Sequence, residues 1–254
     1  MEKVVLITGA SAGLGEEFAR QLAQKGFSLL LVARREERLF TLQQQLCLQY
    51  PDLVIHSFCV DLRDDLAGQQ IIDYLQSNAL SLVGLINNAG FGQRGLFSEI
   101  DVNTHLDMLQ VNIRSLVALT YLAIAEFEVE LSFIVNVAST AAFQAGPNLA
   151  VYYASKAFVL SFSEALHEEL KEKQIQVSAL CPGATNTEFA QVADLSGSLL
   201  FRLRVMEKQA VVDYALANLH KAIVIPGGVN KFGALMAQLS PRSITRKLAY
   251  YIQK

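Results

Sequence analysis

A glycine-rich turn directly after the first apolar segment limits what this chain can fold into. Residues 3–8 (KVVLIT) form a short β-branched run, residues 9–15 read GASAGLG, and a helical pattern begins at Glu16. Glycines let a backbone approach a phosphate closely, and the N-terminus of the following helix offers free N–H groups. The spacing differs from the usual G-x-G-x-x-G, but its place after a first strand predicts a nucleotide-binding α/β unit.

Apolar runs and amphipathic stretches alternate along the rest of the chain. Apolar strands with helices between them indicate a parallel sheet that is covered on both faces. We therefore expect an α/β fold, a Rossmann-like doubly wound parallel sheet of seven strands with helices on both faces. The further strands are predicted at 27–32, 53–60, 82–86, 131–137, 176–180 and 222–225, and helices at 36–49, 64–78, 102–127, 149–165, 207–221 and 240–254.

The composition of the chain indicates a single globular domain and argues against a nucleic-acid-binding protein. A chain of 254 residues, 52% hydrophobic and 18% charged, suits a single domain with a large core. We expect residues 1–187 to be the cofactor and catalytic core, 188–221 a substrate loop and helix, and 222–254 the last strand and a C-terminal helix. The net charge of -3 and the absence of a basic run argue against nucleic acid.

The number and spacing of the cysteines and histidines indicate the cellular location of the protein and whether it has a metal site. The three cysteines and four histidines are widely scattered, which predicts reduced thiols, a cytoplasmic location and no metal site. The longest mostly apolar stretch, 113–125, falls short of a membrane span, so no transmembrane segment is expected.

Polar residues follow several predicted strands. Arg34 and Arg35 end the second strand, Asp61 and Leu62 the third, and residues 87–90 (NNAG) the fourth. The carboxyl ends of parallel strands border the ligand crevice, where arginines suit the 2′-phosphate of NADP and an acidic residue suits the free hydroxyl of NAD. The alternative is that both arginines only solvate the next helix. We favour the phosphate interpretation because of their position.

A tyrosine and a lysine lie four residues apart in a nearly uncharged helical run. Tyr152 and Lys156 share one helix face, and a buried ammonium must be paired or neutralised. A lysine beside a tyrosine favours the phenolate, so the pair suits acid/base chemistry. A lysine that extends its ammonium to the surface is an equally simple explanation of the pair alone. Ser139 follows the fifth strand, where a site hydroxyl or an ordinary helix cap is expected.

Together these motifs resemble the short-chain dehydrogenase/reductase family over residues 3–187. TGASAGLG (8–15) matches the T-G-x-x-x-G-x-G turn of the family, and NNAG matches its fourth-strand motif. Asn112, Ser139, the Tyr152/Lys156 pair and the Pro182-Gly183 loop with Thr187 match the remaining signatures. Ala12 departs from the pattern, because NADP-preferring relatives often carry a basic residue there.

The resemblance implies a role for each site residue. Tyr152 would exchange a proton with the substrate oxygen, Lys156 would lower the pKa of Tyr152 and bind the nicotinamide ribose, and Ser139 would orient the substrate. Asn112 would hold a water in a proton relay. NADP(H) is the implied cofactor, and the residues expected to bind it are Gly9, Ser11, Gly13, Leu14, Gly15, Arg34, Arg35, Asp61, Leu62, Asn88, Ala89, Gly90, Tyr152, Lys156, Pro182, Gly183, Thr185 and Thr187.

The implied activity is NADP(H)-dependent interconversion of a carbonyl and an alcohol on a lipophilic small molecule. Apolar segments at 91–97, 140–150 and 188–205 would form the substrate walls, as in 3-oxoacyl and hydroxysteroid-type reductases. Two alternatives are a non-catalytic NADP-binding sensor on the same fold and a sugar-nucleotide epimerase or dehydratase. The first usually lacks one catalytic group, and the second needs a larger C-terminal region.

Two helices predict a homodimer or homotetramer. Arg114 is the one charged residue in 113–125, and on the tyrosine helix Ala154, Phe158, Ser161 and Ala165 lie opposite Tyr152. Helices that are apolar all round must be covered on every face, and the sheet covers only one side of them. We therefore expect these two helices to pack against a second copy of the chain. The alternative cover is the C-terminal segment of the same chain. A C-terminal helix is expected after Ser240-Pro241; its basic residues could meet an anionic membrane, but we favour docking on its own or a partner subunit.

Overall fold

The computed structural model describes residues 1–189 and 205–253. Its centre is one parallel sheet in the order β3-β2-β1-β4-β5-β6-β7, which confirms the expected seven-stranded, Rossmann-like, doubly wound α/β architecture. The strands are β1 (Glu2–Thr8), β2 (Ser28–Ala33), β3 (Ile55–Cys59), β4 (Leu80–Asn87), β5 (Phe133–Val137), β6 (Gln176–Leu180) and β7 (Ile223–Val224). Because β1 pairs with both β2 and β4, the strand order reverses between β1 and β4.

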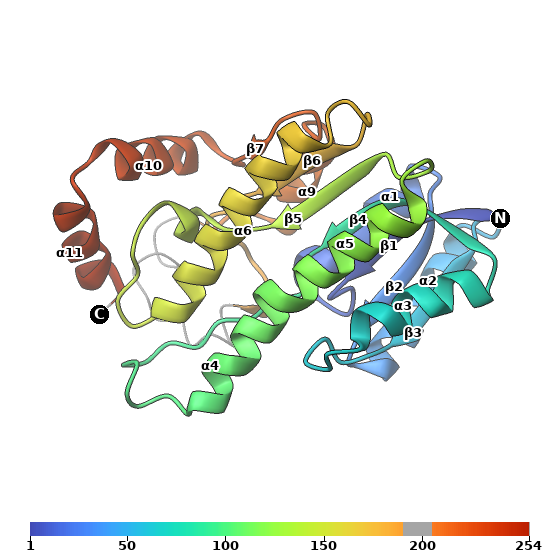
Figure 1. Cartoon of the computed structure of the whole chain (residues 1–254), viewed down its shortest axis with the longest axis horizontal. Coiled ribbons are helices and arrows are strands. Elements are labelled where there is room, and N and C mark those ends of the chain that lie inside the picture. Colours follow the sequence, from blue (N-terminus) through green and yellow to red (C-terminus); the bar gives the residue numbers. More distant parts are fainter. Residues whose placement is uncertain (190–204, 254) are drawn as a thin grey trace.

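Helices cover both faces of the sheet (Figure 1). One face carries α1 (Gly13–Gln24), α2 (Glu36–Gln49) and α9 (Lys208–Leu216). The other carries α3 (Ala67–Ser77), α4 (Val102–Leu109), the π-helical turn η1 (Gln110–Arg114), α5 (Ser115–Phe127) and α6 (Ala150–Glu169). The remaining segments are the 3₁₀ turn η2 (Thr140–Phe143), α10 (Gly228–Leu239) and α11 (Arg242–Gln253).

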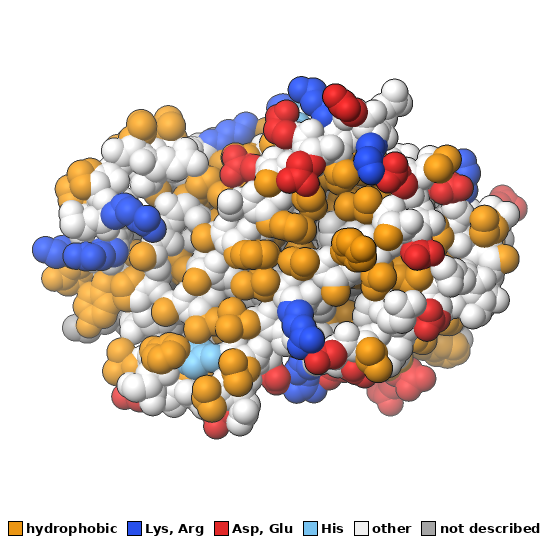
Figure 2. All heavy atoms as spheres, in the orientation of Figure 1, with side chains coloured by type: hydrophobic (Ala, Val, Ile, Leu, Met, Phe, Trp, Pro, Cys, Tyr) orange, Lys and Arg blue, Asp and Glu red, His pale blue; other side chains and the backbone are white. Residues whose placement is uncertain are grey.

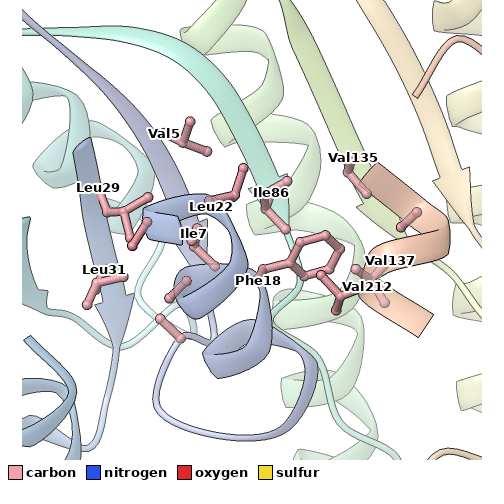
Figure 3. Close-up of a cluster of buried hydrophobic side chains, with 14 of the residues drawn as sticks. Val5, Ile7, Phe18, Leu22, Leu29, Leu31, Ile86, Val135, Val137 and Val212 are labelled. Atoms are coloured by element: carbon pink, nitrogen blue, oxygen red, sulfur yellow. The ribbon is translucent and has the colours of Figure 1, made fainter. Parts of the chain in front are cut away.

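Both cores form because the strands are apolar on both sides. On one face Phe18 and Leu22 of α1 and Val212 of α9 pack over β1, β4 and β5 (Figure 3). On the other face Ile71 of α3 and Leu119 of α5 pack over the same strands. Fully burying such a side chain stabilises the fold by about 1.5–3 kcal/mol. These two layers hold the strand ends, and the loops that follow them, in fixed positions.

The helix predicted at 102–127 is interrupted. Its central turn, η1, is π-helical and carries Asn112, so α4 and α5 are two helices joined by a wider turn. Such turns often occur at functional sites. Counted together, residues 102–127 are long and apolar enough to span a membrane, with 44% of the most apolar stretch buried. The core helix of a soluble protein passes the same test, and here Val111, Leu119 and Ala123 belong to the core.

The C-terminal region differs from the expectation in one respect. The sequence predicts a turn at 226–228 and no helix from there to residue 239, but α10 begins at Gly228. The C-terminal helix is confirmed as α11, which begins at Arg242, where the Pro241 carbonyl accepts hydrogen bonds from the N–H groups of Ile244 and Thr245. Among residues 242–251 of α11, those that are buried are Thr245 and Ala249, so this part of the helix docks on its own subunit through a small face.

Candidate active site

A cavity of about 420 Å³ opens at the carboxyl ends of the strands. Its lining begins with Gly9 after β1, Arg34 after β2 and Asn88 after β4, and continues with Ala138 after β5 and Pro182 after β6. The cavity therefore lies beside the reversal of strand order between β1 and β4, where doubly wound sheets bind ligands.

The glycine turn is held tightly against the end of β4. Asn88 Nδ2 donates to the carbonyl oxygens of Thr8 at 2.9 Å and Gly9 at 3.2 Å. Gly9 and Gly13 have positive φ values of 67° and 60°, and a Cβ on Gly15 would collide with the Gly9 carbonyl oxygen. Side chains at these positions would open the turn, so the backbone presented to the cavity requires glycine.

Arg34 and Asp61 face each other on the neighbouring strand ends. Arg34 Nη1 is 3.9 Å from Asp61 Oδ2, and Arg63 donates to the same carboxylate at 2.6 Å. Partial burial would raise the pKa of Asp61, but the hydrogen bonds from Arg63 and the charge of Arg34 lower it overall. Asp61 is thus a charged, oriented acceptor beside a half-exposed guanidinium.

A second basic group lies over the glycine turn. Arg35 Nε donates to Ser11 Oγ at 3.2 Å. Arg35 and Arg38 both bind the carboxylate of Glu188, at 2.8 and 2.5 Å, and these two arginines lower the pKa of Glu188. The three residues come from α2, the loop before it and a segment about 150 positions away. Two guanidinium groups therefore already hold an anionic side chain at the rim of the cavity.

Tyr152, Lys156 and Ser139 meet at the opposite end of the cavity. Tyr152 and Lys156 come from α6 and are 8% and 5% exposed. Lys156 Nζ donates to the Val137 carbonyl oxygen at 2.7 Å and lies 5.9 Å from the centre of the Tyr152 ring. Ser139 forms a hydrogen bond with Tyr152, and its Oγ also caps η2 by accepting from the Ala141 N–H. The surface-lysine alternative is wrong, because the ammonium is buried in the site.

Burial moves both titratable groups towards their neutral forms. Desolvation raises the pKa of the Tyr152 phenol above its usual range, and the hydrogen bond with Ser139 reverses only part of that rise. Desolvation also lowers the pKa of Lys156 to about 8. The expected lowering of the tyrosine pKa by the lysine is therefore not what the structure gives. The physical reason is that the phenol is fully desolvated, while the ammonium is bound to a backbone carbonyl instead of the phenol.

Asn112 stands behind the site instead of lining it. Its Nδ2 donates to the Phe91 carbonyl oxygen at 2.9 Å and to Ser155 Oγ at 3.0 Å, and its Oδ1 accepts from the Phe91 N–H at 3.0 Å. A Cβ on Gly90 would lie 3.0 Å from Asn112 Oδ1 and 3.4 Å from Lys156 Nζ. Asn112 therefore fixes the chain beside Lys156, and the predicted water relay stays a prediction.

Apolar side chains surround the phenol. The Phe189 ring is 5.3 Å from the Tyr152 ring. The Tyr153 ring contacts the Tyr152 ring edge-on, at 6.1 Å between ring centres. Leu149 and Phe91 line the same part of the cavity. Within the described lining, the cationic side chains are Arg34, Arg35 and Lys156. The described residues also contain no group of three His, Cys, Asp or Glu side chains that could hold a metal ion.

Comparison with known proteins identifies the family. The family model for short chain dehydrogenase matches residues 3–195. The chain belongs to the short-chain dehydrogenase family. Sulfoacetaldehyde reductase 2 of Chromohalobacter salexigens is 36% identical over 196 residues, which is 76% of each chain. The 11-beta-hydroxysteroid dehydrogenase 1A of Arabidopsis thaliana is 34% identical over 197 residues, 77% of this chain and 56% of that one.

Solved structures agree on the fold. A short-chain dehydrogenase from Sphingobium yanoikuyae in complex with NADPH superposes with a TM-score of 0.82 and 31% identity, covering 92% of each chain. A 7beta-hydroxysteroid dehydrogenase reaches a TM-score of 0.86 at 22% identity, which shows the fold alone. This chain is therefore an oxidoreductase of the short-chain dehydrogenase type that binds a nicotinamide cofactor.

In this short-chain dehydrogenase the predicted site residues gather around one cavity with two exceptions. Gly15 packs behind the turn, and Asn112 lies behind Lys156, as described above. Phe189 lines the cavity, as expected for the predicted wall 188–205, most of which lies outside the described residues. Sequence reasoning missed Arg38 and the ion pairs of Glu188, and no local signal links Arg38 to Glu188. The predicted residues that line the cavity are Gly9, Ser11, Gly13, Leu14, Arg34, Arg35, Asp61, Leu62, Asn88, Ala89, Gly90, Ser139, Tyr152, Lys156, Pro182, Gly183, Thr185 and Thr187.

Proposed function

We propose that the protein is an NADP(H)-dependent reductase of lipophilic ketones or aldehydes, with Tyr152 as general acid/base. The observation that carries this proposal is the joint position of Tyr152, Ser139 and Lys156 in an apolar pocket at one end of the cavity. The glycine turn and the arginines lie at its other end, so the cavity suits a cofactor that extends between the two.

The residues fit the nicotinamide cofactor by their chemistry. The cradle formed by Gly9 and Gly13 would be filled by a Cβ at either position, and the α1 N-terminus provides N–H groups for a pyrophosphate. The bound cofactor supplies the hydride. The Tyr152 phenol, which is protonated at neutral pH, gives its proton to the substrate oxygen, and the Ser139 hydroxyl holds that oxygen in place. Lys156 supplies a positive charge beside Tyr152 and Ser139.

The basic groups support NADP over NAD. Arg34 and Arg35 follow β2, and Arg35 together with Arg38 already binds the carboxylate of Glu188. A 2′-phosphate can replace that carboxylate with more charge and more acceptor oxygens. The NADPH complex of the Sphingobium relative points the same way.

The apolar lining supports a lipophilic substrate. Phe91, Leu149, Tyr153 and Phe189 surround the phenol. Reduction of sulfoacetaldehyde is a second candidate, because a relative with that name is 36% identical. A sulfonate needs a cation, and in the described lining Lys156 is the cation at this end, where it is already bound to Val137. We therefore favour the lipophilic carbonyl. We also propose a cytoplasmic location and a homodimer or homotetramer.

The test is NADPH oxidation measured with a panel of bulky ketones, long-chain aldehydes and sulfoacetaldehyde. The proposal expects turnover with the lipophilic compounds. Tyr152→Phe should lower kcat by about a hundredfold to ten-thousandfold, and the control Tyr153→Phe should retain turnover. Cofactor binding by both variants, followed by fluorescence, should equal that of the parent. Turnover of sulfoacetaldehyde alone would establish the second candidate, and cofactor binding with no turnover of any compound would support the sensor alternative.

A further inference from the structure

The last two helices bury their small residues and expose their large apolar ones. In α10 Ala234 is 5% exposed, whereas Phe232 and Leu239 are 64% and 73% exposed. In α11 Ala249 is 3% exposed, whereas Leu248 and Tyr251 are 57% and 74% exposed. A helix that covered its own core would have the opposite arrangement. We call residues 228–253 the C-terminal arm.

Large apolar side chains that are exposed form one stripe along each helix of the arm. At 100° per residue, the large side chains fall within about a third of the circumference of each helix. They are Val229, Phe232, Leu235, Met236 and Leu239 on α10, and Ile244, Leu248 and Tyr251 on α11. Contiguous apolar surface of this kind usually marks a contact with something outside the chain.

The charge of this region is opposite to that of the rest of the molecule. Residues 228–254 contain five basic residues and no acidic one. Since the whole chain has 21 basic and 24 acidic residues, residues 1–227 have 16 and 24, a net charge of -8 against +5. Arg242, Arg246 and Lys247 are exposed on α11. At 100° per residue, Lys247 lies at the edge of the apolar stripe and the two arginines lie on the other side of the helix. An apolar stripe on a helix whose remaining surface is basic is typical of a helix that lies at a lipid surface.

The arm is attached to the wall of the cavity. α10 packs against η2, whose Thr140 and Ala141 line the cavity. Asn230 Nδ2 donates to the Pro226 carbonyl oxygen at 2.8 Å, and Asn230 fills the space beside Gly183. In Figure 1 α10 and α11 lie together at the end of the molecule far from β2 and β3, and Figure 2 shows apolar and basic side chains side by side there.

We propose that the C-terminal arm docks the protein onto an anionic lipid surface. The apolar stripes of α10 and α11 enter the boundary between headgroups and acyl chains, and the basic side chains meet the lipid phosphates. Tyr251, which belongs to the stripe of α11, has an amphipathic ring that suits this depth. A second copy of the arm is a poorer occupant, because pairing would bring two groups of four cations together. The proposal does not depend on the reaction that the site performs.

The test is flotation of the full-length protein with two kinds of vesicle, phosphatidylcholine alone and phosphatidylcholine mixed with phosphatidylglycerol. Binding is expected to the mixed vesicles and to weaken with salt. Replacing two cations in Arg246→Gln/Lys247→Gln should weaken binding by about 25-fold, at about fivefold for each cation. The control Lys171→Gln/Lys173→Gln, which removes two exposed lysines outside the arm, should bind as the parent does.

A second pair of variants tests the apolar stripe. Phe232→Ser and Leu248→Ser change exposed side chains, so thermal unfolding should match the parent, while binding to the mixed vesicles should fall. The proposal is overturned if the protein does not float with the mixed vesicles, or if the arm variants and the control bind equally. It is also overturned if light scattering shows that Phe232→Ser and Leu248→Ser dissociate an oligomer while vesicle binding is unchanged, since a second copy would then cover the stripe.

Discussion

Replacing the buried Lys156 with methionine should stabilise the fold at neutral pH while it removes turnover. The ammonium is 5% exposed, and desolvation lowers its pKa from 10.5 to about 8. Methionine has a similar length and carries no charge to bury. The folded state therefore loses an unfavourable charge, and the site loses the cation beside Tyr152.

The magnitude follows from the pKa. The pKa of Lys156 is lowered by about 2.5, and each pKa unit corresponds to about 1.36 kcal/mol. The charged lysine therefore destabilises the fold by about 3 kcal/mol. Below pH 8 both the folded and unfolded chains carry this proton, so the penalty is complete and does not change with pH. Between pH 8 and 10.5 only the unfolded chain holds the proton, so the stability that this lysine removes is regained as pH rises. Above pH 10.5 the penalty is gone.

Urea unfolding at pH 7 and pH 10.5 measures this difference directly. The hydrogen bond to Val137 offsets part of the gain, by about 0.5–1.5 kcal/mol, so we expect the variant to be about 2 kcal/mol more stable at pH 7. That advantage should shrink by about 3 kcal/mol on going to pH 10.5. The control Lys171→Met replaces a side chain that is 72% exposed and should change stability by less than about 0.5 kcal/mol at both pH values. An advantage of Lys156→Met that is constant with pH would refute the reasoning.

Three further predictions concern the cofactor end and the subunit contacts. Arg34→Ala should lower the preference for NADPH over NADH in kcat/KM by about tenfold or more, since a charge-assisted bond contributes about 1.5–3 kcal/mol; an unchanged preference would exclude Arg34 from the phosphate site. Glu188→Gln removes the carboxylate that Arg35 and Arg38 hold and should tighten NADPH binding by up to about fivefold, as measured by fluorescence titration, with NADH binding unchanged. Ala154→Glu should dissociate the proposed oligomer in light scattering, because Ala154 is exposed on α6; an unchanged mass would rule out pairing through this face.

The sheet and the motifs could be predicted because each is a local pattern. Strands such as residues 176–180 are short apolar runs, and the structure reproduces these bounds for β6. The chemistry-bearing residues follow the strands directly, so a parallel sheet necessarily brings them to one edge. The resemblance to the family then placed Tyr152, Lys156 and Ser139 together, and the cavity lining agrees.

The features that could not be predicted from the sequence depend on contacts between residues far apart in the chain and on burial. The contact of Arg38 with Glu188 joins residues 150 positions apart, and both look like ordinary surface charges. α10 was missed because Gly227 and Gly228 indicate a turn and because its apolar stripe does not face the core. The π-helical turn at Asn112 has no signal that distinguishes it from a continuous helix. The direction of the tyrosine pKa was wrong because the spacing shows the neighbour but not the desolvation.

The same burial has a consequence for the direction of the proposed reaction. Reduction needs a phenol that can give up a proton, whereas oxidation needs a phenolate that can accept one. Desolvation raises the pKa of Tyr152, so the phenol is protonated at neutral pH, as a free phenol is, and is a weaker acid than a free phenol. Lys156, with its pKa near 8, is still mostly charged there and can stabilise the phenolate left after proton transfer. At neutral pH the phenol therefore carries the proton that reduction needs, whereas oxidation must first remove a proton from a buried phenol, which becomes easier as pH rises.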